Sequence, residues 1–113
     1  MTKIPMTVPI ATRTLRFERA NGSEVDVTVT LGTPIPDPSD PERTWACPYE
    51  IRGPAKHRTM TIFGVDSMQA LILAVHVLPA HLGAIAREDG GRFVDDADLR
   101  INDSCRANLG RLA

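Results

Sequence analysis

The sequence predicts an α+β domain in which a four-stranded antiparallel meander packs on one long C-terminal helix. Three observations support this fold: apolar and polar residues alternate in four short runs, turn residues separate those runs, and a helix-length apolar run follows them. The 113 residues are enough for one hydrophobic core. We therefore expect residues 1–113 to form a single domain, with an N-terminal tail over 1–11 and a C-terminal extension over 90–113.

The first two strands are predicted from the run TRTLRFERANGSEVDVTVTLG. Its apolar residues must share one face, so opposed residues need numbers of the same parity. A two-residue loop excludes that parity, whereas a three-residue loop allows it. The hairpin therefore pairs Phe17 with Val25 and Leu15 with Val27, and Gly22 takes the left-handed position of the turn.

A proline-rich segment and two further strands follow the hairpin. Residues 32–43 hold four prolines and no alternation, which predicts an exposed loop that does not extend the ladder. The runs TWACPYEIRG and HRTMTIF alternate again and give the third and fourth strands. Pro48 indicates that the third strand lies at an edge or carries a bulge. In the fourth strand, Met60 and Ile62 are expected to point inward.

The helix is predicted to begin after Asp66, its N-cap, with Gln69 completing a variant of the capping box. The run VDSMQALILAVHVLPAHLGAIA is apolar almost all round, although a surface helix needs one apolar stripe. At about 100° per residue, one stripe suits the sheet, and its members are Leu71, Val75, Leu78, Leu82 and Ile85.

A second apolar row on this helix would face water in a monomer. Its members are Leu73, Val77, Ala80 and Ala84. A second copy of the helix is the simplest cover, because the small residues allow two helices to approach closely. We therefore expect a homodimer with these four residues at its interface. The alternative is that segment 99–113 covers the row within one chain.

The sequence contains few groups that favour catalysis. Cys47 could act as a nucleophile with His57 as its base, but it lies on the apolar face of its strand, where a buried thiol is the commoner role. A small-ligand site or enzyme centred on Cys47, Tyr49 and His57 is the alternative to an interaction protein. No GxSxG, Walker, GxGxxG or HExxH motif occurs.

We expect no cofactor and no metal. His76 and His81 are five residues apart, so they cannot chelate one ion as an i, i+4 pair does. An acidic turn resembles a calcium loop but lacks the glycine of an EF-hand and has Arg100 where a further oxygen ligand is needed. The acidic residues of that turn are Asp95, Asp96 and Asp98.

Composition indicates a cytoplasmic protein. The net charge of −1 provides no excess of basic residues for a nucleic-acid backbone. The N-terminal residues contain no apolar stretch of signal-peptide length. Pro79 and two histidines interrupt the apolar run, so we expect it to be no membrane span. Both cysteines are expected to be reduced thiols.

One combination of motifs resembles a known family. The pattern W-x-C-P-Y-x-I-x-G is followed by a strand and then by G-x-D-x-x-Q-A-L. It is carried by Trp45, Cys47, Pro48, Tyr49, Ile51, Gly53, Gly64, Asp66, Gln69, Ala70 and Leu71. These residues resemble a bacterial family of short proteins known as a domain of unknown function, and the resemblance runs from about residue 13 to 83. It implies a compact α+β domain in a bacterial cytoplasm and brings no activity.

These observations favour a non-enzymatic interaction or accessory domain that self-associates. An immunity-type partner is one form that such a protein could take. We expect a homodimer, no binding of nucleic acid and no association with a membrane.

Overall fold

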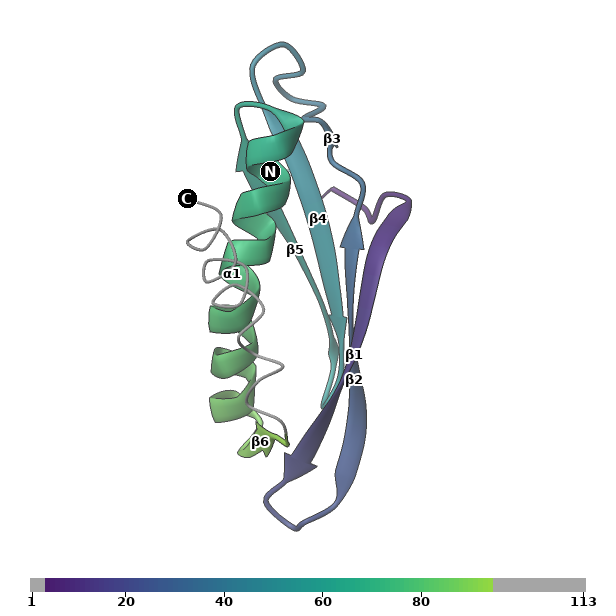
Figure 1. Cartoon of the computed structure of the whole chain (residues 1–113), viewed down its shortest axis with the longest axis vertical. Helices are drawn as coiled ribbons and strands as arrows, with labels where there is room; N and C mark the ends of the chain where they lie inside the picture. Colours follow the sequence, from purple (N-terminus) through teal and green to yellow (C-terminus); the bar gives the residue numbers. More distant parts are fainter. Residues whose placement is uncertain (1–3, 95–113) are drawn as a thin grey trace, which may run out of the picture.

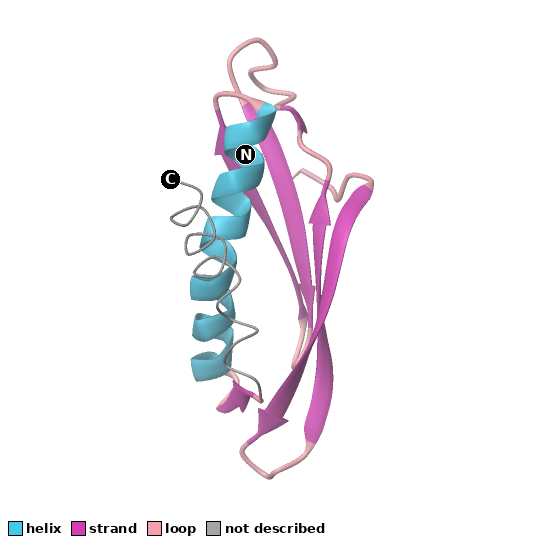
Figure 2. Ribbon diagram, viewed as in Figure 1, coloured by secondary structure: helices cyan, strands magenta, loops and turns pink. Residues whose placement is uncertain are grey.

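The computed structural model describes residues 4–94 and shows one antiparallel sheet with a single helix along one face (Figure 1). The strands form one layer and the helix the other (Figure 2). In chain order the elements are β1 (Pro9–Arg19), β2 (Glu24–Gly32), β3 (Ile35–Pro36), β4 (Trp45–Arg52), β5 (His57–Gly64), α1 (Ser67–Glu88) and β6 (Gly91–Phe93). The α+β class is as the sequence predicts.

The predicted four-strand meander is present as β1, β2, β4 and β5, but the sheet has six strands within the described residues. The short β3 pairs with the start of β4, and β6 pairs with the end of β1. Both additions have two or three residues, which is too short for an alternating pattern to identify them. β6 therefore lies inside the predicted C-terminal extension over 90–113, where the sequence pattern predicts no strand.

The β1–β2 hairpin has the predicted register. Phe17 lies opposite Val25 and Leu15 opposite Val27. The turn is closed by the Arg19 N–H, which donates to the Ser23 carbonyl at 2.8 Å. Gly22 has a φ of 86°, the left-handed conformation that a three-residue hairpin loop needs. Pairing in β1 begins at Pro9, so residues 9–11 belong to the sheet.

The prediction that Pro48 marks an edge strand is wrong, because β4 lies between β5 and β2. The alternative of a bulge agrees better with the structure, because the register on the β2 side shifts beside Pro48: Tyr49 pairs with Leu31 of β2, whereas Ala46 pairs with Ile35 of β3. The alternation of the ladder directs the backbone nitrogen of Pro48 toward this break. A residue without an N–H is therefore tolerated in a central strand.

The proline-rich segment is partly ordered by pairing. The ladder of β2 extends to Gly32, and Ile35–Pro36 forms β3, so the prediction of an unpaired loop over 32–43 is corrected at both places. Beyond β3, the Asp37 N–H donates to the Thr44 carbonyl at 2.8 Å, which closes the remaining loop.

The core lies between the sheet and α1. Its buried members are Leu15, Phe17, Val27, Val29, Leu31, Cys47, Tyr49, Ile51, Ala70, Ala74, Leu78, Leu82, Ile85 and Phe93. Small residues bring the start of the helix close to the sheet, because Ala70 and Ala74 are fully buried and a Cβ on Gly64 would meet the Ala70 backbone. The helix N-cap is Asp66, whose carboxylate accepts the Gln69 N–H at 2.7 Å. The Gln69 carboxamide in turn accepts the Val65 N–H at 2.8 Å.

By length and composition alone, α1 could cross a membrane. In this structure it packs on β4 and β5 and reaches β6 at its C-terminal end. The core helix of a small domain meets the same length and composition test, so this feature carries no argument for a membrane.

Candidate functional site

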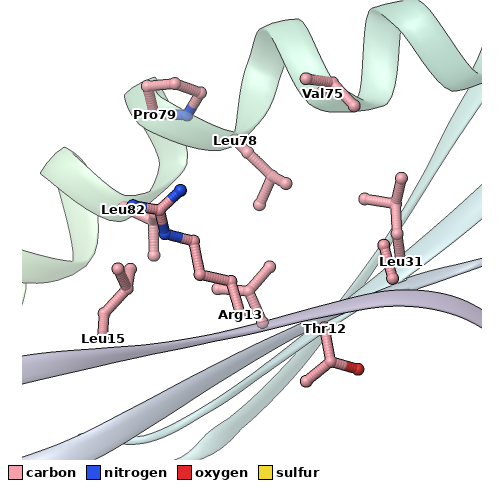
Figure 3. Close-up of a pocket in the computed structure, with 10 residues that line it drawn as sticks. Thr12, Arg13, Leu15, Leu31, Val75, Leu78, Pro79 and Leu82 are labelled. Atoms are coloured by element: carbon pink, nitrogen blue, oxygen red, sulfur yellow. The ribbon is translucent and has the colours of Figure 1, made fainter. Parts of the chain in front are cut away.

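An apolar groove lies between α1 and the N-terminal half of β1 (Figure 3). It has a volume of about 150 Å³. Its lining residues are Ala11, Thr12, Arg13, Leu15, Val29, Leu31, Val75, Leu78, Pro79 and Leu82. Figure 3 shows Leu15, Arg13 and Leu31 extending from the strands toward the helix, while Thr12 points away from it. We refer to this feature as the α1–β1 groove.

The groove exists because α1 follows β4 and β5 rather than β1. Figure 1 shows the N-terminal half of β1 diverging from the helix. Leu15, Val29 and Leu31, which β1 and β2 direct to the inner face, are buried, but a groove remains between them and the helix at this end. Because the lining is almost wholly apolar, the groove suits apolar side chains.

The edge of β1 beside the groove has a short partner. β6 pairs with Phe17–Arg19, and the Val94 N–H donates to the Arg16 carbonyl at 2.9 Å. Within residues 4–94, no strand pairs with residues 9–15 on this side. The backbone N–H and carbonyl groups of every second residue point to the same side of a strand. The Arg16 carbonyl points toward this edge, where it accepts the Val94 N–H, so the N–H groups of Thr12 and Thr14 point toward it too.

Besides the apolar groove, a contact between two polar side chains lies between the helix and the sheet. The Tyr49 hydroxyl lies 2.7 Å from His81 Nδ1, and the two rings meet edge to face with centroids 5.7 Å apart. Burial raises the pKa of Tyr49 to about 12. Burial, followed by the nearby Arg58 charge, lowers the pKa of His81. At neutral pH, a protonated phenol therefore shares a hydrogen bond with a neutral imidazole, and the tautomer of His81 decides which of the two donates.

Arg58 lies at the end of the same interface. Its guanidinium approaches Asp89 at 3.5 Å and Glu88 at 3.6 Å, and its side chain is 10% exposed. Both Nη atoms of Arg58 lack a hydrogen bond, as does Asp89 Oδ2. The cluster joins the start of β5 to the C-cap of α1, and we assign it a structural role because none of its members lines the groove.

The structure does not bring Cys47 and His57 together. Cys47 faces the core opposite Ile62, and its thiol lies 3.5 Å from the Gly32 carbonyl. Burial raises the pKa of the Cys47 thiol. His57 projects from the other face of the sheet, where its Nε2 lies 2.9 Å from a Glu50 carboxylate oxygen. The proposed Cys47, Tyr49 and His57 site is therefore not assembled.

Tyr49 instead meets His81, a partner that the sequence reasoning missed. The available signal was spacing: His81 follows the buried Ala74 by seven residues, which returns it to nearly the same side of the helix. Within residues 4–94, no group of three or more potential metal ligands lies together. The acidic turn Asp95, Asp96 and Asp98 lies outside the described residues.

The predicted interface row lies at the surface of α1. Leu73, Ala80 and Ala84 are exposed, and Val77 is half-buried. Other large apolar side chains are exposed on β5, just before the helix and in its first turns, and they are Met60, Phe63, Val65, Met68 and Ile72. The helix is thus fixed to the sheet on one side and apolar over much of the other.

One family comparison identifies a relationship. A family model described as a domain of unknown function (DUF6968) matches residues 11–99. The match extends beyond residue 83, where the resemblance in the sequence motifs ended, and it includes the acidic turn. Neither a curated protein nor a solved structure matches the chain.

Proposed function

The chain belongs to DUF6968, a domain family of unknown function, and from this premise we propose that it is a non-enzymatic interaction domain that self-associates through the outer surface of α1. The observation that carries the proposal is the exposure of Leu73, Ala80 and Ala84, in one row with the half-buried Val77, on a helix that is anchored by its opposite side. A bacterial cytoplasmic setting and an accessory or immunity-type role are part of the same proposal.

The exposure of a large apolar side chain beside small residues supports an interface. Leu73 is 37% exposed on a helix whose opposite side is buried against the sheet. Contiguous exposed apolar surface on a soluble domain commonly marks a contact with another molecule. Ala80 and Ala84 lie on the same stripe of the helix as Leu73, are exposed, and are small enough to permit close approach of a second helix.

The spacing of the row suits a twofold partner. If two copies of α1 cross antiparallel about a point between Val77 and Ala80, Leu73 lies opposite Ala84 and Val77 lies opposite Ala80. Each large side chain then meets a small one, which is the pairing that fills an interface evenly. A symmetric row of this kind favours a second copy of the chain over an unrelated partner.

Light scattering tests the proposal. The wild-type chain should have a mass near twice 12.3 kDa at micromolar concentration, and the double substitution Leu73→Glu/Val77→Glu should return it to 12.3 kDa. Ile72→Glu is the matched control, because Ile72 is exposed on the other flank of the same turn and should leave the dimer intact. A monomeric wild-type chain would refute self-association.

A further inference from the structure

The free edge of β1 and the α1–β1 groove together form a place where a strand can add to the sheet. We propose that the occupant is the chain's own segment 95–99, which continues from β6 alongside β1 and places Leu99 in the groove. This proposal is independent of the Leu73 row, because the groove lies on the opposite flank of α1.

β6 delivers the segment to this edge. It runs antiparallel to β1, with Phe93 opposite Phe17, and the Val94 N–H already donates to the Arg16 carbonyl. Continuing the same register places Asp95 opposite Leu15 and Leu99 opposite Ala11. The β1–β2 ladder becomes irregular between Pro9 and Ala11, so Ala11 is the last position of regular strand that the segment can follow.

The alternation of side chains matches the two faces. Phe93 is buried on the inner face and packs edge to face against Phe17, with ring centroids 5.2 Å apart. Side chains at odd positions therefore share that face, so Asp95, Ala97 and Leu99 point to the inner face and Asp96 and Asp98 point to solvent. Opposite Leu99, the small Ala11 leaves room in a groove whose other walls include Leu31 and Val75.

Charge favours the same pairing. In this register Asp95 lies diagonal to Arg13 on the inner face, and Asp96 lies diagonal to Arg16 on the outer face. Diagonal neighbours on one face of an antiparallel pair are within reach of long side chains, and opposite charges there are favourable. A second copy of β1 would instead bring arginines near arginines, which disfavours direct pairing of two β1 edges. The family match also ends at residue 99, where this strand would end.

Amide hydrogen exchange of the full chain tests the proposal. The Thr12 and Thr14 amides face the edge, so they should be protected in the wild type and should exchange at least about tenfold faster in Leu99→Asp. The matched control is Leu109→Asp, which makes the same change outside the segment and should leave both amides protected. The Leu15 amide, which faces β2, reports whether the sheet remains folded; if it too loses protection, the milder Leu99→Ala replaces Leu99→Asp in the comparison.

Three results would overturn the proposal. The first is fast exchange of Thr12 and Thr14 in the wild type, which would leave the edge without an occupant. The second is an equal loss of protection in Leu99→Asp and Leu109→Asp, which would remove the role of segment 95–99. The third is protection that falls on dilution, because it would show that the strand comes from another copy of the chain. Protection that is independent of concentration supports an occupant from the same chain.

Discussion

The Tyr49 hydroxyl lies 2.7 Å from His81 Nδ1, and this contact joins the centre of the sheet to the C-terminal half of α1. Tyr49 is among the fully buried side chains, so its hydroxyl needs a partner inside the protein. The His81 imidazole is this partner, and it is uncharged at neutral pH because burial lowers its pKa. The pair therefore fixes how the helix sits on the sheet.

Tyr49→Phe removes the hydroxyl and leaves the half-buried Nδ1 of His81 without its hydrogen-bond partner. We expect the substitution to lower the free energy of unfolding by about 1–3 kcal/mol, the cost of leaving a buried polar group unpaired. Urea denaturation measures the loss. The double variant Tyr49→Phe/His81→Leu is the control, since removing both polar groups should cost less than the two single losses added together. Strict additivity would contradict a coupled pair.

Acidification should destabilise the protein through His81. The pKa of His81 is lowered in the folded state from its ordinary value of 6.5, so the unfolded chain binds a proton first as pH falls. Stability from this group is complete above pH 6.5 and declines as pH falls from there toward the folded-state pKa. Denaturation midpoints between pH 8 and pH 5 should show this decline. In His81→Leu the decline should be smaller; an unchanged profile would exclude His81 as its source.

Cys47 is expected to be a structural residue. It is fully buried beside Tyr49 on β4, and burial raises the pKa of its thiol. Cys47→Ala should lower stability by about 1 kcal/mol, as a small truncation in a core does. Thiol labelling in a Cys105→Ser background should be slow in the native state and fast in denaturant. Rapid native labelling at neutral pH would indicate a reactive thiolate and would revive the enzyme hypothesis.

The loop beyond β3 should show two exchange regimes. The Asp37 amide donates to Thr44 and should be protected, whereas Glu42 is exposed and should exchange rapidly. Amide exchange followed by NMR separates the two. Slow exchange of both amides would mean that the whole segment is part of the sheet, and rapid exchange of both would mean that the Asp37–Thr44 hydrogen bond does not hold the loop.

The parts of the fold that could be predicted are those in which one physical rule covers many residues. Parity together with a short loop determines the β1–β2 register, and the helical period identifies the stripe that includes Leu78 and Leu82. The errors occur where a feature depends on a contact made elsewhere in the fold. Pro48 is tolerated in a central strand because β2 ends and β3 begins beside it, which no pattern within β4 reveals.

The same distinction applies to the candidate sites. The exposed row on α1 follows from periodicity within one element, so the sequence identifies its members. The α1–β1 groove and the Tyr49–His81 contact require the angle between helix and sheet, which depends on how closely their residues allow the two to approach. Gly64 is the position where that approach is tightest.

Gly64→Ala should therefore destabilise the protein although its backbone conformation is open to other residues. A Cβ at this position would lie 2.5 Å from the Ala70 nitrogen and 2.9 Å from its Cα. Both atoms belong to the backbone of the first helical turn, so the start of α1 must move away from β5. Overpacking of this kind costs about 1–3 kcal/mol.

Gly83→Ala makes the same chemical change in the middle of α1, where the nearest atom to the added Cβ is Arg87 Nη1 at 3.7 Å. This substitution should raise stability by about 0.5–1 kcal/mol, because alanine loses less conformational freedom than glycine when a helix forms. Urea denaturation of the two variants should thus give shifts of opposite sign. If both variants were stabilised, the helix start could not be in close contact with β5, and the angle that opens the α1–β1 groove would have to be set by other residues.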